Sequence, residues 1–326
     1  MVRSRFRASA VAALAALTLA SAPSAAQSPA PIDVEIAVNA PGAGNWLVYV
    51  AQYGNFFRDE GLRVGITNTG TPTTTIDAVA SGGANIGFDG TDVAIEAIAH
   101  QLPLRIIAPE FVPSPYALLT TAAVGSWNEL KGKTVILGAP GDISSITFDL
   151  MIEARGFKRS DYTIVRGQTS SSRYQALLSG NVAATVLSQP FSILAADNGM
   201  RTLAMARDTV KDWVDTCVVV NANWAAANHG TVVRFVRALR KGAQQAYARP
   251  DLAVAALVTV TGIAEDTARK AYDLDFRRWH AFEPNLRMNV NGLRTMVGLA
   301  VREGAIANAP AVGEIFDPSY VNEGVR

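Results

Sequence analysis

The feature that most constrains the fold is a regular alternation of strand-like and helix-like segments. Leu47, Val50, Ala51 and Phe57 recur at three- and four-residue spacing, which is typical of a helix that follows a short apolar strand. The strand-like runs of this first series lie at 34–38, 62–67, 84–88 and 104–110. Strands that alternate with helices form parallel βα units, so the pattern predicts an α/β fold.

Two prolines in FVPSPY (111–116) break this rhythm before a second series begins. Its strand-like runs lie at 116–121, 133–138, 162–165, 183–187 and 201–205. The valine-rich run at 217–224 predicts a return strand, and the remaining chain has mostly helical spacing. We therefore expect two lobes, 27–112 with 217–326 and 113–216, each a mostly parallel sheet flanked by helices and joined by two hinge crossings. Ligands of such sheets bind at the carboxyl ends of the strands.

The N-terminus has the composition of a secretory signal peptide. It combines a basic start, MVRSRFR, with an apolar run at 8–20 and a small-residue exit that ends at Ala26. The apolar run is shorter than the roughly 20 residues that a membrane-spanning helix needs. We expect residues 1–26 to be removed as a signal peptide and the protein to be periplasmic.

Composition excludes several classes of function. Removal of the signal peptide takes away Arg3, Arg5 and Arg7. The mature chain then has 26 of the 29 basic residues and 28 acidic ones, so its net charge is close to zero. This balance offers no electrostatic basis for binding nucleic acid. No later apolar stretch has spanning length, so the chain is not expected to be membrane-embedded. Cys217 is the only cysteine, which rules out an intramolecular disulfide.

The motifs in the chain do not assemble a catalytic set. The glycine-rich stretch GAPGDISSITFD (138–149) lacks the lysine and the spacing of a nucleotide-binding loop. KGKTV (131–135) precedes a strand, whereas a phosphate loop follows one. The three histidines show no metal-ligand spacing. We therefore expect no catalytic residues, no metal and no cofactor.

Polar turns follow many of the expected strands and are the remaining candidates for a site. They are 41–46, 68–74, 88–92, 138–145, 167–172 and 188–190. In a two-lobed α/β protein such turns line the cleft, and helix N-termini present backbone N–H groups there. The same Ser, Thr and Asp residues are also ordinary helix N-caps. Residue type alone does not decide between these two roles.

Four longer stretches resemble a known family. They are YVAQYGNFFRDEGLRVGI (49–66), DAVASGGANIGFDGTDVAIEAIAHQLPLRIIA (77–108), LKGKTVILGAPGDISSITFDLMIEARGFKRSDYTIV (130–165) and RYQALLSGNVAATVLSQPFSILAADNGMRTLA (173–204). Their motifs are similar to those of extracytoplasmic solute-binding proteins of ABC importers, in the branch that includes nitrate, sulfonate, taurine and thiamine-precursor receptors. The resemblance implies a type II periplasmic-binding fold and a monomer that delivers a small polar or anionic organic solute to permease and ATPase subunits.

Carried over residue by residue, the resemblance also implies a ligand site. The expected contacts are Asn45, Trp46, Thr71, Thr73, Thr74, Asp89, Gly90, Thr91, Asp142, Ser144, Ser145, Gln168, Thr169, Gln189 and Asp215. The aromatic residues that could pack on a flat solute are Trp46, Tyr116 and Trp213.

Three questions about the function stay open: the role of two aspartates, an enzyme activity on the same fold, and a sensory role. Asp89 and Asp142 either cap helices or meet the solute, and a carboxylate that faces the ligand favours a solute with N–H donors over an anion. An enzyme of pyrimidine synthesis shares the fold, but that family is cytosolic and uses a lysine-bound cofactor with iron. A sensory binding module would have the same sequence features as an import receptor.

Overall fold

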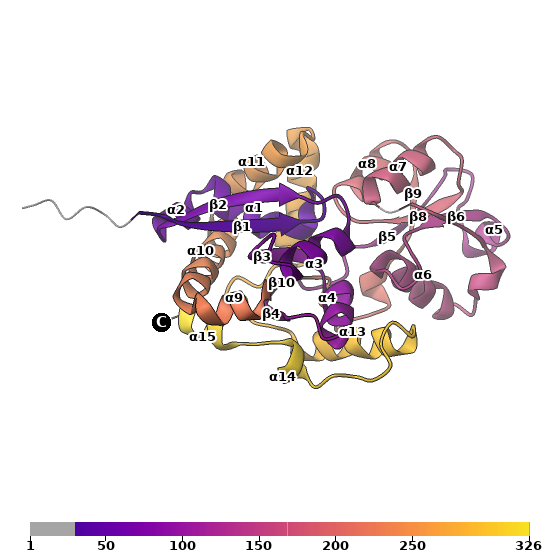
Figure 1. Ribbon diagram of the computed structural model, residues 1–326. Helices are drawn as coiled ribbons and strands as arrows, with labels where there is room; N and C mark the ends of the chain where they lie inside the picture. Colours follow the sequence, from indigo (N-terminus) through magenta and orange to yellow (C-terminus); the bar gives the residue numbers. More distant parts are fainter. Residues whose placement is uncertain (1–29, 168, 326) are drawn as a thin grey trace, which may run out of the picture. The chain divides into compact units, whose positions relative to one another are not determined.

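The computed structural model describes residues 30–167 and 169–325, so the signal peptide expected at 1–26 and the site residue Gln168 lie outside the described residues. Residues 31–326 form one compact unit with two five-stranded sheets (Figure 1). The exact lobe boundaries expected from the sequence remain a prediction.

The first sheet has the strand order β2-β1-β3-β10-β4. Its strands are β1 (Ile32–Val38), β2 (Leu62–Asn68), β3 (Ile86–Gly90), β4 (Leu104–Phe111) and β10 (Thr216–Asn221). Side chains alternate across β1: Val34, Ile36 and Val38 join the core on one face, and Ala37 joins the core on the other. Helices α1, α10 and α11 contribute to the first core, and α3, α4 and α13 contribute to the second.

The second sheet has the order β7-β6-β8-β5-β9. Its strands are β5 (Ala117–Thr120), β6 (Thr134–Leu137), β7 (Thr163–Arg166), β8 (Ala184–Leu187) and β9 (Arg201–Met205). Helix α6 packs on one face through Phe148 and Met151. Helices α7 and α8 pack on the other face, where Tyr174 and Leu177 are buried.

Each sheet is mixed, because one strand in each runs against the others. In the first sheet β10 is antiparallel to β3 and β4, and in the second β5 is antiparallel to β8 and β9. Both reversed strands come directly after the chain has passed from one sheet to the other. Thr216 at the start of β10 pairs with Gly90 at the end of β3, so the chain enters the sheet from the carboxyl ends of the other strands. This entry point is why the otherwise parallel pattern is interrupted.

The helices follow the expected alternation. They are α1 (Trp46–Tyr53), α2 (Phe56–Asp59), α3 (Pro72–Ala80), α4 (Thr91–Ala99), α5 (Trp127–Leu130), α6 (Ile143–Glu153), α7 (Ser170–Leu178), α8 (Phe191–Asp197), α9 (Ala222–Ala227), α10 (His229–Ala248), α11 (Pro250–Thr261), α12 (Glu265–Tyr272), α13 (Val290–Arg302), α14 (Val312–Ile315) and α15 (Ser319–Gly324). Short 3-10 helices occur at Ala43–Asn45, Arg159–Asp161 and Ala206–Asp208, and a π-helix at Asp273–Arg278. Among the described residues, no helix is both long and apolar enough to cross a membrane.

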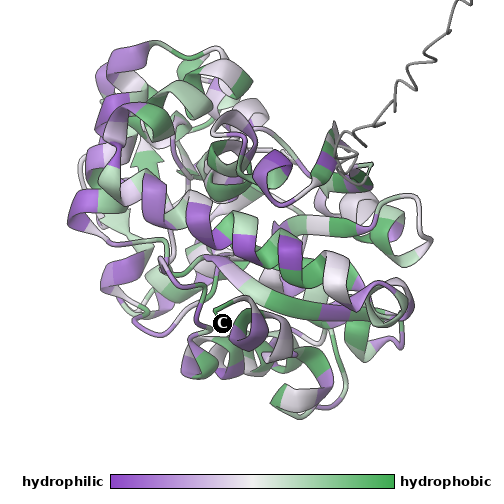
Figure 2. Ribbon diagram, turned by 90° about the vertical axis from the view of Figure 1, so that its left-hand side faces the viewer, coloured by the Kyte–Doolittle hydropathy of each residue, from purple (hydrophilic) through white to green (hydrophobic). Residues whose placement is uncertain are grey.

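In helix α10 the regular spacing of apolar residues that predicts a helix corresponds to a buried face. It buries Val232, Phe235, Val236 and Leu239 at intervals of three and four residues, and Phe235 stacks on Phe57 with 5.3 Å between ring centroids. Hydrophobic and hydrophilic positions alternate along the helices in the same way (Figure 2).

One helix start differs from the sequence-based expectation. In the sequence, Thr74 and Asp77 have the spacing of a capping box and predict a helix over about 74–81 that starts at Thr74, and this predicted start is wrong. Thr71 is the N-cap: its hydroxyl accepts a hydrogen bond from the Thr74 N–H at 3.2 Å, and Pro72 occupies the first helical position. Proline is favoured there because its missing N–H would have no partner in the helix anyway.

Candidate functional site

The carboxyl ends of β3 and β4 meet the returning chain at the start of β10. The backbone N–H of Thr91 donates to the carbonyl of Asp215 at 2.9 Å, and the N–H of Asp215 donates to the carbonyl of Phe111 at 2.8 Å. The hydroxyl of Thr216 donates to the carbonyl of Gly44 at 2.7 Å. These contacts place the first turn of α4 beside the second crossing.

Six titratable residues gather where the two sheets approach each other. We call them the polar junction: Asp89, Asp92, Tyr116, Asp142, Arg173 and Asp215. Asp92 is coupled electrostatically to Asp142 and Asp215, and Tyr116 to Arg173 and to three of the aspartates. The junction therefore combines residues of both sheets and both crossings. It holds four carboxyl groups and one guanidinium.

Asp89 is a fully buried carboxyl at the end of β3 and is not a helix cap. Its Oδ1 accepts hydrogen bonds from Asn39 Nδ2 at 3.1 Å and from the Gly90 N–H at 2.7 Å. Its Oδ2 is buried and has no hydrogen-bond partner of normal geometry among the described residues. Burial raises the pKa of Asp89 to about 8, against smaller lowering effects of these donors. Asp89 is thus largely protonated at neutral pH.

Asp92 faces the second sheet from the first turn of α4. Burial, followed by the charge of Asp142, raises the pKa of Asp92 to about 7, while the N–H of Ile143 at the start of α6 opposes this rise. A Cβ atom on Gly90 would lie 2.3 Å from Asp92 Oδ1, so only glycine leaves room for this carboxylate. The pKa of Asp215 is also raised by burial, and its Oδ1 accepts a hydrogen bond from Trp213 Nε1 at 3.1 Å.

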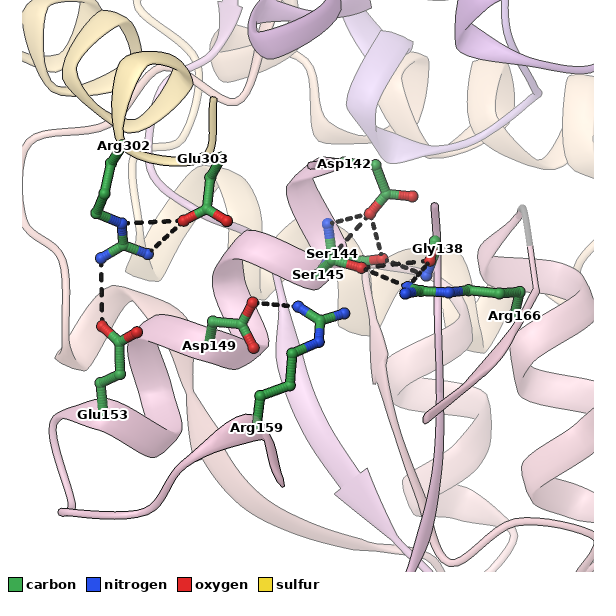
Figure 3. A network of polar contacts seen from close by, with 10 residues as sticks. All are labelled: Gly138, Asp142, Ser144, Ser145, Asp149, Glu153, Arg159, Arg166, Arg302 and Glu303. Carbon is green, nitrogen blue, oxygen red and sulfur yellow. Dashed lines mark hydrogen bonds and ion pairs between the residues drawn. The ribbon is translucent and has the colours of Figure 1, made fainter. Parts of the chain in front are cut away.

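The glycine-rich turn at 138–145 is built around the Asp142 carboxylate (Figure 3). Asp142 Oδ1 accepts hydrogen bonds from the N–H groups of Ser144 and Ser145, both at 3.0 Å, and from the Ser144 hydroxyl at 2.8 Å. The Ser145 hydroxyl donates to the carbonyl of Gly138 at 3.3 Å, and Arg166 donates to the same carbonyl. Asp142 is therefore the N-cap of α6. The donors expected to face a solute serve the turn itself.

This arrangement predicts the effect of removing the cap. Asp142→Ala should lower the free energy of unfolding by about 1 kcal/mol, because two helix N–H groups lose their acceptor. Asp142→Asn retains an oxygen at the same place and should lose less. Urea denaturation at pH 7 measures both, and equal losses in the two variants would contradict the capping role.

Arg173 supplies the positive charge of the junction. It is 3% exposed, and its Nε donates to the carbonyl of Val186 at 3.1 Å while its guanidinium also donates to the carbonyl of Gly167 and the Ser170 hydroxyl. Burial lowers the pKa of Arg173, and the charge of Asp142 opposes that effect. The guanidinium is held in place by backbone carbonyls of the second sheet.

Two of the other expected site residues, Trp46 and Asn45, are buried in the protein interior. Trp46 belongs to the core: it is fully buried, its Nε1 donates to the carbonyl of Ala253 at 2.8 Å, and its ring meets Phe276 edge to face at 5.1 Å. Its indole N–H is therefore not available to a solute, because a helix carbonyl already accepts it. Asn45 is 3% exposed and donates to Asn39 and Ala40, next to Asp89.

The remaining expected contacts lie at loop ends. Thr71, Thr73 and Thr74 form the partly exposed start of α3. Thr169 caps α7 by accepting from the Ser172 N–H at 3.1 Å. Gln189 is 2% exposed, and its backbone carbonyl lies near Gly42 in the loop after β1.

Two carboxyl groups near these loops were not expected. Asp92 was overlooked although it belongs to the FDGTD turn, whose next residues form a helix. Glu110 is fully buried, and its Oε1 accepts a hydrogen bond from the Leu47 N–H at 2.8 Å at the start of α1. A charged residue inside the apolar run LRIIAPEF was the available signal for Glu110.

Nucleophiles and metal ligands do not gather at this site. Burial raises the pKa of the Cys217 thiol, which lies fully buried in β10 and is unsuited to act as a thiolate. His229 pairs with Glu323, away from the junction. Within the described residues, no group of three or more His, Cys, Asp and Glu side chains is arranged to hold a metal.

Comparison with known proteins agrees with this architecture. The model of the family described as "NMT1/THI5 like" matches residues 45–253. A curated relative, 4-amino-5-hydroxymethyl-2-methylpyrimidine phosphate synthase of Aspergillus parasiticus, is 22% identical over 247 residues, which cover 70% of this chain and 71% of the relative.

Two solved structures show the same fold. The ligand-binding component of an ABC-type import system from Staphylococcus aureus, solved with zinc bound, has a TM-score of 0.79 at 13% identity and covers 90% of this chain and 99% of its own. The periplasmic aliphatic sulphonate binding protein SsuA from Escherichia coli has a TM-score of 0.70 at 15% identity, covering 89% and 93%. The predicted α/β fold with two helix-flanked sheets is confirmed.

Proposed function

The chain belongs to the NMT1/THI5-like family, and we propose that it is a periplasmic receptor that binds a small organic solute at the polar junction and delivers it to an ABC importer. The observation that carries this proposal is the junction itself. Polar groups from both sheets converge there, and the two crossings that join the sheets frame it. A solute that contacts both sides stabilises the closed arrangement, as hinge-type binding proteins require.

The charges of the junction favour a solute that donates hydrogen bonds. The N-terminus of α6, which would otherwise suit an anion, is already satisfied by Asp142. Asp92 and Asp215 add two further carboxyl groups, and burial raises the pKa of both. A sulfonate finds the helix N–H groups occupied and is repelled by any ionised carboxyl of the junction, whereas amine, amide or ring N–H groups can donate to carboxyl oxygens in either protonation state.

The curated relative's name raises a second function, an enzyme of pyrimidine synthesis. The lysine-bound cofactor of that family needs a lysine in the site. All six lysines of this chain are exposed, and none belongs to the polar junction: Lys131, Lys133, Lys158, Lys211, Lys241 and Lys270. The residues present therefore do not fit that cofactor, and binding without turnover is the better-supported proposal.

Thermal unfolding with a solute panel tests the proposal. We expect an aminopyrimidine or amide with N–H donors to raise the Tm, because a ligand that binds only the folded state stabilises it by mass action. Alkanesulfonates and nitrate should produce smaller shifts. Native mass spectrometry of protein purified from its own periplasm identifies any solute it retains.

Matched variants locate the binding. Asp92→Asn should reduce the solute-induced shift, whereas Asp33→Asn, at an exposed carboxylate paired with Arg63, should leave it unchanged. Chemical conversion of a bound solute, or no shift with any member of the panel, would overturn the proposal. Neighbouring genes for a permease and an ATPase would favour import over sensing.

A further inference from the structure

Two helices of the second sheet also contact the first sheet. Helix α8 buries Ala195 in the core of its own sheet, whereas its Ile193 belongs to the core that α1, α10 and α11 form on the first sheet. Helix α6 buries Phe148 in its own core, whereas its Ile146 belongs to the cluster that contains Met296 of α13. Helix α8 thus lies beside α12, and α6 lies beside α13 (Figure 1).

The last residue of each of these two helices is an acid that pairs with a base of the first sheet's helices. Asp197 ends α8, and the Nζ of Lys270 on α12 lies 2.7 and 2.9 Å from its two carboxylate oxygens. Glu153 ends α6, and its Oε2 accepts a hydrogen bond from Arg302 on α13 at 3.2 Å (Figure 3). The two helices therefore repeat one arrangement, an apolar contact followed by an ion pair.

These acids do not stabilise their own helices. A carboxylate in the last turn of a helix meets the negative end of the helix dipole, which is an unfavourable position. Neither α6 nor α8 has a basic residue in its last turn to compensate. The compensating charges of Lys270 and Arg302 come from the other sheet. The two ion pairs therefore favour the arrangement in which the two sets of helices stay in contact.

The segments that carry the two bases are fixed against the two crossings. In the first crossing, the Val112 N–H donates to the carbonyl of Ala281, in the segment that follows α12, at 2.8 Å. At the second crossing, a Cβ atom on Gly292 of α13 would lie 2.8 Å from the carbonyl carbon and oxygen of Trp213, so the helix backbone approaches the crossing closely. A rotation of the second sheet about the crossings therefore moves α6 and α8 relative to α12 and α13.

We propose that the pairs Asp197–Lys270 and Glu153–Arg302 form a latch that holds the two sheets in the arrangement described above and that opens when the sheets separate. The latch rests on the proposed function for the existence of a second, more open arrangement. Its four side chains are between 40% and 56% exposed, so salt screens them. One such pair shifts an equilibrium by about two- to fivefold, and the two together by about tenfold. The latch thereby sets the fraction of protein that is ready to hold a solute, without contacting the solute.

Pulsed electron–electron resonance between two nitroxide labels tests the latch on the full protein without any solute. The labels are attached at Gln175→Cys on α7 and Thr259→Cys on α11, two exposed positions on helices of different sheets, whereas Cys217 is buried. Asp197→Asn combined with Glu153→Gln should raise the population at a second distance about tenfold relative to the first. About 1 M NaCl should shift the parent protein in the same direction and the double variant much less.

Two controls make the result specific. Asp33→Asn combined with Glu60→Gln removes two exposed carboxylates of the same types, each paired with an arginine on the first sheet or its helices, and should leave the distances unchanged. Asp197→Lys alone should open the latch, and adding Lys270→Asp should restore most of the parent distribution, because the exchanged charges attract again. Circular dichroism first confirms that each variant is folded.

The outcomes separate the latch from the proposed function. Unchanged distances in the Asp197→Asn, Glu153→Gln variant, or an equal change in the control variant, would overturn the latch. Solute binding is measured separately, by thermal unfolding with the panel described above. Distances that respond as expected in a protein that binds no member of the panel would support the latch and remove the receptor function.

Discussion

Gly138→Ala should lower the free energy of unfolding by about 2–4 kcal/mol. A Cβ atom at this position would lie 1.4 Å from Asp142 Oδ2 and 2.2 Å from its Cγ, so the carboxylate would have to leave its place. The N–H groups of Ser144 and Ser145 and the buried Ser144 hydroxyl would then lose their acceptor, and the overpacking of the added Cβ against Asp142 costs about 1–3 kcal/mol more. Urea denaturation of the wild type and the variant at pH 7 measures the loss.

A double-mutant cycle shows whether the carboxylate causes this loss. The three atoms closest to the added Cβ all belong to Asp142. In an Asp142→Ala background, Gly138→Ala should therefore cost well below 1 kcal/mol, and the two substitutions should be strongly non-additive. Additive losses would mean that the glycine serves the backbone rather than the cap.

Asp89→Asn should make stability less dependent on pH. The pKa of Asp89 is raised to about 8 in the folded protein, against an ordinary value of 3.8. Between these two values the folded state holds a proton that the unfolded state releases, so the free energy of unfolding falls as pH rises. The variant lacks this ionisation. Its stability relative to wild type should grow by up to about 1.4 kcal/mol per pH unit between pH 5 and pH 7.

Denaturation curves of both proteins at pH 5, 6 and 7 measure this difference in slope. Asparagine has nearly the same shape, and its carbonyl can accept from Asn39 and Gly90 as Oδ1 does. Asp33→Asn is the control, because Asp33 is exposed and its pKa is lowered by Arg63. Parallel pH profiles for wild type and Asp89→Asn would show that Asp89 ionises normally in the folded state.

The two predictions rest on aspartates that look alike in the sequence. Each follows a strand and stands near a glycine, and either could have capped a helix. The backbone decides between them: Asp142 has an extended conformation directly before α6 and caps it, whereas Asp89 is the next-to-last residue of β3 and lies one residue before the N-cap Gly90. Only the position relative to the first helical turn separates the two roles, and local sequence does not specify that position to within one residue.

The α/β class and the order of strands and helices could be predicted from the amino-acid sequence. Those depend on hydrophobic periodicity, which is a local property of the chain. It also indicated which turns would be polar. The tertiary structure alone decided which of those turns meet. Asp92 and Asp142 are 50 positions apart, yet the charge of Asp142 helps to raise the pKa of Asp92. Trp46, by contrast, is buried in the core, where its indole N–H donates to the carbonyl of Ala253. Such contacts depend on how distant segments pack, so the polar junction emerged only once both sheets were in place.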